Sequence, residues 1–323
     1  MVLPALVEIE AAAAVIRPVV PPTPQYAWPL LAARAGCEVW VKHENHTPIG
    51  AFKIRGGVYF AHRRRAAGHV VGGLISATRG NHGQSLALAC RAVGLPLTLV
   101  VPQGNSVEKN AAMRAFGANV IEHGEDFEAA RRHAAVLGPA RGLEMVSPFQ
   151  RDLVCGVATY ALELFRAVSH LASVYVPIGM GSGICGLIAV RDALELDTEI
   201  VGVVATGAPA YALSFAAGRV IETACAVTMA DGVACRVPSP EAFAIIQRGA
   251  ARIVQVDDAE IMEAMRAYYV DTHNLAEGAG AAALAGLLHE REAQRGKKVA
   301  VILSGGNIDR AQYLPILRDG TPD

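Results

Sequence analysis

Three glycine-rich segments recur in this 323-residue chain at the same kind of position, between a short run of β-branched residues and a longer amphipathic run. They read SATRGNHGQS (76–85), IGMGSGICG (178–186) and LSGGNID (303–309). A strand that leads through a loop into a helix is the repeating unit of a mostly parallel sheet covered by helices on both faces. Because such sheets bind ligands beyond the carboxyl ends of their strands, the loops predict one shared ligand site.

Apolar patterning supports this α/β prediction along the chain. Predicted strands cover Glu38–Lys42, Val70–Ile75, Leu97–Val101, Asn119–Glu122, Ser173–Pro177, Ile200–Ala205 and Lys297–Leu303. Predicted helices cover Gln84–Val93, Ser106–Phe116, Asp126–Leu137, Asp152–Ser169 and Asp258–His273. Hydrophobic residues make up 52% of the chain and charged residues only 18%, which is ample apolar material for a large core. The length accommodates two domains or one large one.

Charge and cysteine usage argue against several classes of protein. The net charge is -1, which gives no electrostatic footprint for nucleic acid or for an anionic membrane. The six cysteines form no CxxC pair, and we recognise no secretory signal or long apolar span. We therefore expect a cytoplasmic protein that acts on a small molecule and binds neither nucleic acid nor membrane.

The first two glycine loops have the chemistry of anion sites. Backbone N–H groups at a helix N-terminus attract negative charge, and glycine lets a ligand approach the backbone closely. Ser182 adds a hydroxyl to the second loop. Two such loops predict a ligand with two anionic ends.

A lysine in the segment GAFKIRGG (50–57) lies between a phenylalanine and an isoleucine. An amine among apolar side chains loses its proton more easily and can then attack a carbonyl to form a Schiff base. If Lys53 faces the three loops, its neighbours are two anion sites and the hydroxyl of Ser304. This arrangement predicts that Lys53 holds an aldehyde cofactor.

Five ordered motifs then carry a resemblance over nearly the whole chain: TPIGAFKIRGG, TRGNHGQS, GMGSGICG, AEGAGAAA and SGGNID. They resemble those of the fold-type-II pyridoxal-phosphate enzymes, above all the threonine and serine dehydratases and serine racemase. The resemblance implies the α/β fold of the tryptophan synthase β subunit, with two open, twisted, mostly parallel sheets. It also implies a small mobile domain at 73–146, a large cofactor-binding domain at 1–72 and 147–323, and a homodimer.

The resemblance implies a role for each matching residue. Pyridoxal 5′-phosphate would be held by Lys53, which is also the catalytic base, with Phe52 beside the ring, Asn81 at its 3-hydroxyl and Ser304 at its nitrogen. The phosphate group would be bound by a loop made of Gly179, Met180, Gly181, Ser182 and Gly183. The substrate carboxylate would be bound by a second loop made of Thr78, Arg79, Gly80, Asn81 and His82.

The implied reaction removes water and ammonia from a β-hydroxy α-amino acid of the threonine, serine or 3-hydroxyaspartate type, and gives a 2-keto acid or its imine. A neutral hydroxyl at Ser304 leaves the ring nitrogen largely unprotonated, which favours β-elimination over transamination. Racemisation and β-replacement on the same fold are the alternatives. A ligand-binding protein without catalysis is a less favoured one.

Arg79 is the largest departure from the family pattern, because relatives usually have a small residue there. In serine racemase that residue is a serine that serves as a second base. A guanidinium stays protonated and cannot take up the proton, so racemisation is disfavoured. The Arg79 side chain either binds a second carboxylate of the substrate, or turns outward and pairs with an acidic residue of the other domain or of a partner subunit.

A metal ion is not expected. The acidic positions that bind a divalent cation in some relatives align with Ala205 and Tyr211. The segment HENH (43–46) offers two histidines but lacks a third ligand nearby, which favours a structural role.

Overall fold

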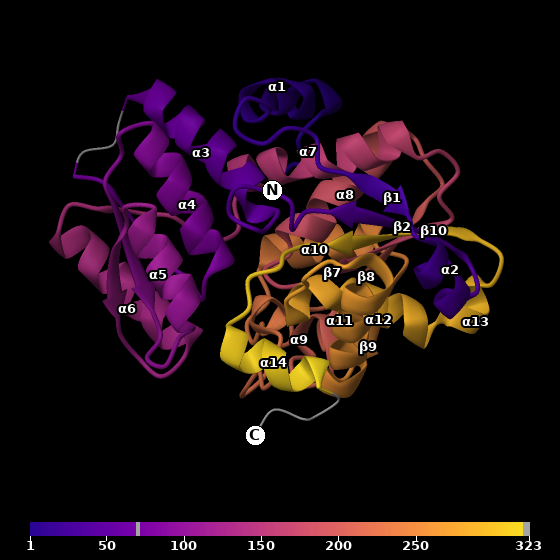
Figure 1. The fold of residues 1–323 in the computed structure, drawn as a ribbon. Helices are drawn as coiled ribbons and strands as arrows, with labels where there is room; N and C mark the ends of the chain where they lie inside the picture. The colour runs from indigo at the N-terminus through magenta and orange to yellow at the C-terminus, as the bar shows by residue number, and fades with distance from the viewer. Residues whose placement is uncertain (69–71, 319–323) are drawn as a thin grey trace.

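The computed structural model describes residues 1–68 and 72–318, which form two lobes, each built on its own sheet (Figure 1). The six strands of the larger sheet lie in the order β1 (Gln25–Ala27), β2 (Glu38–His43), β10 (Lys298–Leu303), β7 (Ser173–Pro177), β8 (Glu199–Ala205) and β9 (Arg252–Val256). Strand β1 pairs antiparallel with β2, and the other neighbours pair in parallel. The central strands are buried on both faces, which explains their nearly continuous apolar sequences.

Helices cover both faces of the larger sheet. One face carries α7 (Arg151–Ala167), α8 (Ser182–Ala193) and α10 (Pro240–Gly249), with α1 (Leu6–Ile16) packed against α7. The opposite face carries α2 (Pro29–Ala35), α11 (Asp258–Thr272), α12 (Gly278–His289) and α14 (Arg310–Leu317). Three short helices complete the lobe: α9 (Ala210–Ala217), the 3-10 turn η1 (Asp231–Val233) and α13 (Arg291–Gln294).

The smaller sheet is parallel throughout. Its strands lie in the order β5 (Asn119–Glu122), β4 (Leu97–Val101), β3 (Leu74–Ala77) and β6 (Glu144–Met145). One face packs against α4 (Asn81–Ala92) and α5 (Val107–Ala115), and the other against α6 (Phe127–Ala140). Helix α3 (Lys53–Ala67) joins the lobes, since it packs against α4 on one side and α7 on the other.

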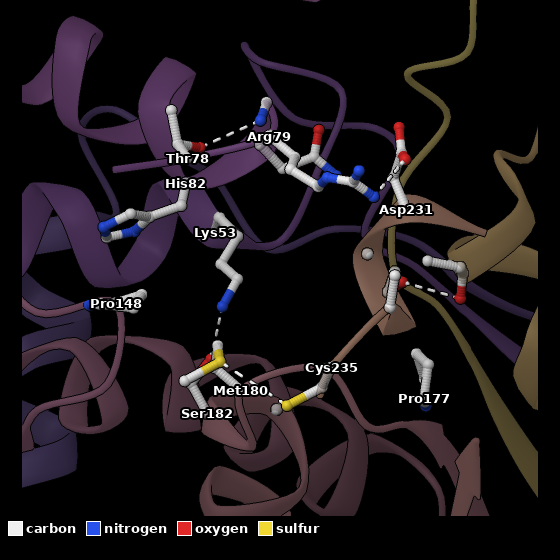
Figure 2. A pocket seen from close by; sticks show the side chains of 18 of the residues that line it. Lys53, Thr78, Arg79, His82, Pro148, Pro177, Met180, Ser182, Asp231 and Cys235 are labelled. Atoms are coloured by element: carbon white, nitrogen blue, oxygen red, sulfur yellow. Dashed lines mark hydrogen bonds and ion pairs between the residues drawn. The ribbon is translucent and has the colours of Figure 1, made fainter. Parts of the chain in front are cut away.

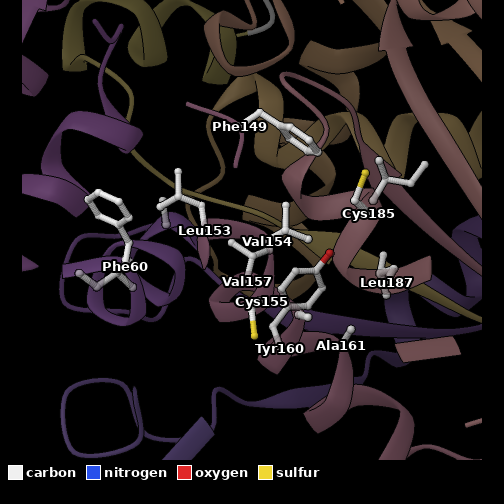
Figure 3. Close-up of a cluster of buried hydrophobic side chains, with 14 of the residues drawn as sticks. Phe60, Phe149, Leu153, Val154, Cys155, Val157, Tyr160, Ala161, Cys185 and Leu187 are labelled. Atoms are coloured by element: carbon white, nitrogen blue, oxygen red, sulfur yellow. The ribbon is translucent and has the colours of Figure 1, made fainter. Parts of the chain in front are cut away.

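The contact between α3 and α7 lies in the main core, beside Phe60, Leu153 and Val157 (Figure 3). Two glycines let the helix backbones touch there. A Cβ added at Gly56 would lie 2.8 Å from the carbonyl oxygen of Leu153, and one at Gly156 would lie 2.5 Å from that of Arg55. The two helices therefore pack as closely as their backbones allow, which helps to position the start of α3.

The α/β architecture with two mostly parallel sheets confirms the sequence prediction. Strands β4, β5 and β7 match their predicted ends, and β2, β8 and β10 differ by one residue at one end. The strand predicted at Val70–Ile75 is found at Leu74–Ala77, and residues 70 and 71 lie outside the described part. The division into domains at 73–146 stays a prediction. Within the described residues no helix is both long and apolar enough to cross a membrane.

Candidate active site

The carboxyl ends of β3, β7 and β10 open onto one pocket between the lobes. All the residues that the sequence assigned to the site line it: Phe52, Lys53, Thr78, Arg79, Gly80, Asn81, His82, Gly179, Met180, Gly181, Ser182, Gly183 and Ser304. The structure adds further lining residues, among them Lys109, Phe127, Pro148, Asp231, Cys235 and Glu277. Residues far apart in the chain therefore meet where the parallel strands end.

Lys53, the first residue of α3, points its amine into this pocket (Figure 2). Nζ donates a hydrogen bond to Oγ of Ser182 over 2.9 Å and lies 5.0 Å from the centre of the Phe52 ring. Desolvation lowers the pKa of Lys53 from 10.5 to about 8. A substantial fraction of the amine is therefore neutral near pH 8 and able to act as a nucleophile or a base.

A buried ionic network lies beneath the start of α3. Arg55 is fully buried and donates to Glu44 through Nε at 2.7 Å and to Glu163 through Nη1 at 2.7 Å. Lys42 also donates to Glu163, at 2.6 Å. Although burial alone would raise the pKa of Glu44, the cations Arg55 and Lys42 hold it below its ordinary value. This network ties the helix that carries Lys53 to strand β2 and to α7.

The loop Gly179–Gly183 leads into the N-terminus of α8. Gly181 is the N-cap residue with φ of 97°, and no side chain caps the helix. A Cβ at Gly179 would lie 2.1 Å from the carbonyl oxygen of Gly232, so only glycine fits. The first N–H groups of α8 are thus left for an anion in the pocket. Tyr211 donates to the carbonyl of Met180 at 3.3 Å and supports this loop.

The small lobe contributes the loop 78–83 to the opposite wall. Oγ1 of Thr78 accepts hydrogen bonds from the N–H groups of Gly80 and Gly83, both at 3.0 Å, which closes a tight turn. Asn81 begins α4 and donates to Glu277 at 2.5 Å. Burial and the nearby charge of Lys53 lower the pKa of His82 to about 3, so its imidazole is neutral.

Arg79 reaches across the pocket to an acidic residue of the large lobe (Figure 2). Its Nη1 lies 3.2 Å from Oδ1 of Asp231. Nζ of Lys109 lies 3.5 Å from the other oxygen of Asp231 and 3.2 Å from Glu277. Burial alone would lower the pKa of Lys109, but the carboxylates of Glu277 and Asp231 raise it. Two cations of the small lobe thus face two carboxylates of the large lobe. Arg79 pairs with the other lobe, but it lines the pocket and does not turn outward. Its contact with a substrate stays a prediction.

Comparison with known proteins identifies the family. The profile of the family described as "Pyridoxal-phosphate dependent enzyme" matches residues 16–305. The chain belongs to this family of pyridoxal-phosphate dependent enzymes. The predicted family, its fold and its cofactor are therefore confirmed.

Two curated relatives in the pyridoxal-phosphate family are ammonia-lyases. An L-threonine ammonia-lyase of Geobacter sulfurreducens is 35% identical over 85% of this chain and 69% of its own length. An L-threo-3-hydroxyaspartate ammonia-lyase of Saccharomyces cerevisiae is 29% identical over 98% of this chain and 97% of its own. Among solved structures, maize serine racemase has a TM-score of 0.89 at 26% identity and covers 98% of both chains.

The residues of the pocket fit pyridoxal phosphate. The amine of Lys53 lies beside the uncapped N-terminus of α8, which suits an aldehyde that carries a phosphate group. Phe52 offers an aromatic face, and Ser304 offers a hydroxyl that donates to the carbonyl of Ala279 at 3.4 Å. In the described part of the chain, no group of three or more His, Cys, Asp or Glu residues is arranged to hold a metal ion.

The sequence reasoning missed Lys109 and Asp231. Lys109 and Met113 are one helical turn apart, so a cation and an apolar residue share one buried face of α5. This pattern in the sequence could have indicated that Lys109 lies on a buried face. Asp231 begins the 3-10 turn η1, which is too short for a periodic pattern to mark a buried face.

Proposed function

We propose that this enzyme is a dehydratase, or ammonia-lyase, that removes water and ammonia from a β-hydroxy α-amino acid. The observation that carries the proposal is the amine of Lys53, which has a lowered pKa and lies 2.9 Å from Ser182 at the N-terminus of α8. The names of the curated relatives support the same reaction class.

In this proposal Lys53 holds pyridoxal phosphate, and the loop Gly179–Gly183 binds its phosphate group. Phe52 would lie beside the ring, Asn81 would bond its 3-hydroxyl, and Ser304 would face its nitrogen. When bound, the cofactor stabilises the negative charge that develops at the substrate Cα.

The loop 78–82 binds the α-carboxylate of the substrate, through the backbone N–H groups at the start of α4. Once the substrate amine has taken its place on the cofactor, Nζ of Lys53 would be a free amine, and its lowered pKa would let it accept the proton that leaves Cα. The neutral hydroxyl of Ser304, unlike a carboxylate, would leave the ring nitrogen largely unprotonated, which limits electron withdrawal into the ring and favours loss of the β-hydroxyl over transamination. Arg79 stays protonated, and its lack of basicity argues against the racemase alternative.

The charges near Arg79 favour a neutral substrate side chain. Arg79 and Lys109 carry two positive charges, and Asp231 and Glu277 carry two negative ones, so no net positive charge remains for a second carboxylate. Serine and threonine are therefore the preferred substrates. A 3-hydroxyaspartate is the second candidate, because Nε of Arg79 is buried without a hydrogen-bond partner.

We also propose a cytoplasmic homodimer with a mobile small domain at 73–146. Exposed apolar side chains on α2, α11 and α14 support the dimer, among them Leu30, Tyr269 and Leu314. These helices pack on one another on one face of the large sheet. A second copy of the chain would shield this apolar surface.

The proposed reaction is tested by product analysis. Purified holoenzyme is incubated with L-serine, L-threonine, L-threo-3-hydroxyaspartate and, together with a small thiol as nucleophile, O-acetylserine, and keto acid, ammonia, D-amino acid and thioether are measured. Keto acid and ammonia in equal amounts support the proposal. D-amino acid or thioether as the main product would establish racemisation or β-replacement instead, and no product from any substrate would favour a binding protein.

A further inference from the structure

Helices α5 and α14 exchange N-terminal caps across the boundary between the lobes. Asp309 is the N-cap residue of α14, but its side chain does not cap α14. Its carboxylate instead accepts hydrogen bonds at the start of α5, from Oγ of Ser106 and from the N–H of Val107. In return, Glu108 in the first turn of α5 accepts the N–H of Arg310 at 3.0 Å. Each helix N-terminus therefore binds a carboxylate of the other lobe.

These reciprocal caps connect the loop that follows β10 with the helix that packs against the loop 78–83. Asp309 follows Ser304 by five residues in the loop after β10. Figure 1 shows that α14 begins on the side of the large lobe that faces the small lobe. Helix α5 packs against α4, whose first residue, Asn81, lies within the loop 78–83.

Helix α5 also touches the loop 78–83 with no spare room. A Cβ at Gly80 would lie 2.4 Å from Cδ of Lys109, and a Cβ at Gly83 would lie 2.4 Å from Sδ of Met113. Both contacts are with side chains of α5, which a methyl group at either glycine would have to push aside. The loop and α5 are thus in direct contact, and a shift of α5 changes the packing of the loop.

We propose that Asp309 and Glu108 are positioning residues, which clamp α5 to the large lobe and so hold the loop 78–83 in place for the substrate carboxylate. That the loop binds the substrate carboxylate rests on the proposed function. The effect of Asp309 on the position of the loop does not depend on it. Without the clamp, the loop is in its binding position for a smaller fraction of the time. The apparent affinity for substrate falls by that fraction, while kcat at saturation is nearly unchanged.

The first test is amide hydrogen exchange in the holoenzyme without substrate. Asp309→Ala is expected to speed exchange over residues 78–83 and 107–110 by on the order of tenfold. Asp309→Asn keeps an acceptor oxygen at the same place and is expected to restore most of the protection. Asp257→Ala is the matched control, because Asp257 caps α11 in a reciprocal capping box with Glu260. It is expected to leave exchange over 78–83 unchanged.

The second test separates positioning from stability. With serine or threonine, Asp309→Ala and Glu108→Ala are each expected to raise KM about tenfold, which corresponds to about 1.4 kcal/mol, with little change in kcat. The double variant is expected to raise KM little more than either single variant, since both act through one clamp.

The proposal is overturned if Asp309→Ala behaves like Asp257→Ala, with a lower melting temperature but unchanged KM and unchanged exchange over 78–83. If the wild type releases no keto acid from any β-hydroxy amino acid, the proposed function fails. The hydrogen-exchange experiment tests the clamp in either case, because it does not depend on turnover.

Discussion

Nζ of Lys53 lies 2.9 Å from Oγ of Ser182, although 129 positions separate the two residues in the chain. Each is the first residue of a helix, α3 for Lys53 and α8 for Ser182. The N-terminus of α8 attracts anions, so an anion bound there becomes an immediate neighbour of the amine. An aldehyde that carries a phosphate group can therefore interact with both at once, through its phosphate at the N-terminus of α8 and through its aldehyde at the amine of Lys53.

The amine of Lys53 is expected to react at a lower pH than an ordinary lysine. Desolvation lowers its pKa to about 8, so the amine loses its proton, and becomes reactive, as the pH rises through about 8. The rate at which the visible absorbance of bound cofactor appears is measured in apoenzyme between about pH 6 and pH 12. A midpoint near 8 is expected, and a midpoint near 10.5 would contradict the lowered pKa.

Asp231→Asn is expected to shift substrate preference toward 3-hydroxyaspartate. The change leaves Arg79 without its carboxylate, so the guanidinium can pair with a second carboxylate of the substrate. The ratio of kcat/KM for hydroxyaspartate to that for threonine should rise about tenfold. Adding Arg79→Ala should abolish the gain. An unchanged ratio, or a gain that persists in the double variant, argues against this account of the side-chain site.

Glu44→Gln is expected to destabilise the protein strongly. Glu44 is fully buried and accepts two hydrogen bonds from Arg55, so its loss leaves buried positive charge without compensation. The free energy of unfolding, measured by urea denaturation, should fall by about 3–5 kcal/mol. Glu199→Gln is the control, because Glu199 pairs with Arg252 at the surface. This change should lower the free energy of unfolding by less than about 1 kcal/mol. Equal losses in the two variants would mean that the network does not anchor α3.

Catalysis is expected to survive removal of divalent cations. Tyr211, at a position where some relatives have an acidic ligand, donates to Met180 and accepts from the N–H of Ser239. Keto acid release is compared before and after exhaustive chelation, and again after addition of magnesium. Unchanged rates are expected. A large loss that magnesium restores would reveal a cation site.

Local patterns predict most of the sheets, because strands that are buried on both faces are apolar runs bounded by loops. The apolar runs of β4 and β7 leave little choice of boundary. Helix α12 (GAGAAALAGLLH) was not predicted, because it is buried on nearly every side and has no polar face to create a period. Helix α3 was missed for another reason, since its first turns contain two glycines that serve packing against α4 and α7.

The residues of the candidate site also fall into two groups, those that the local sequence predicts and those that it does not. Lys53 and the glycine loops carry local chemical signals, and the structure brings them into one pocket. Asp231 and Lys109 enter that pocket only because the two lobes meet, and such a contact between distant segments leaves no mark in the local sequence. For the same reason, the sequence could not decide which group pairs with Arg79.

The most direct test of the account compares wild-type enzyme and Lys53→Ala with the β-hydroxy amino acids serine and threonine. Loss of keto acid and ammonia by at least about a thousandfold is expected in the variant, because in the proposed function one side chain supplies both the link to the cofactor and the base. Circular dichroism and the melting temperature check that the variant is folded. A wild type that releases keto acid and ammonia in equal amounts, beside an inactive folded variant, is the predicted result. Turnover by Lys53→Ala near the wild-type rate would contradict the central claim.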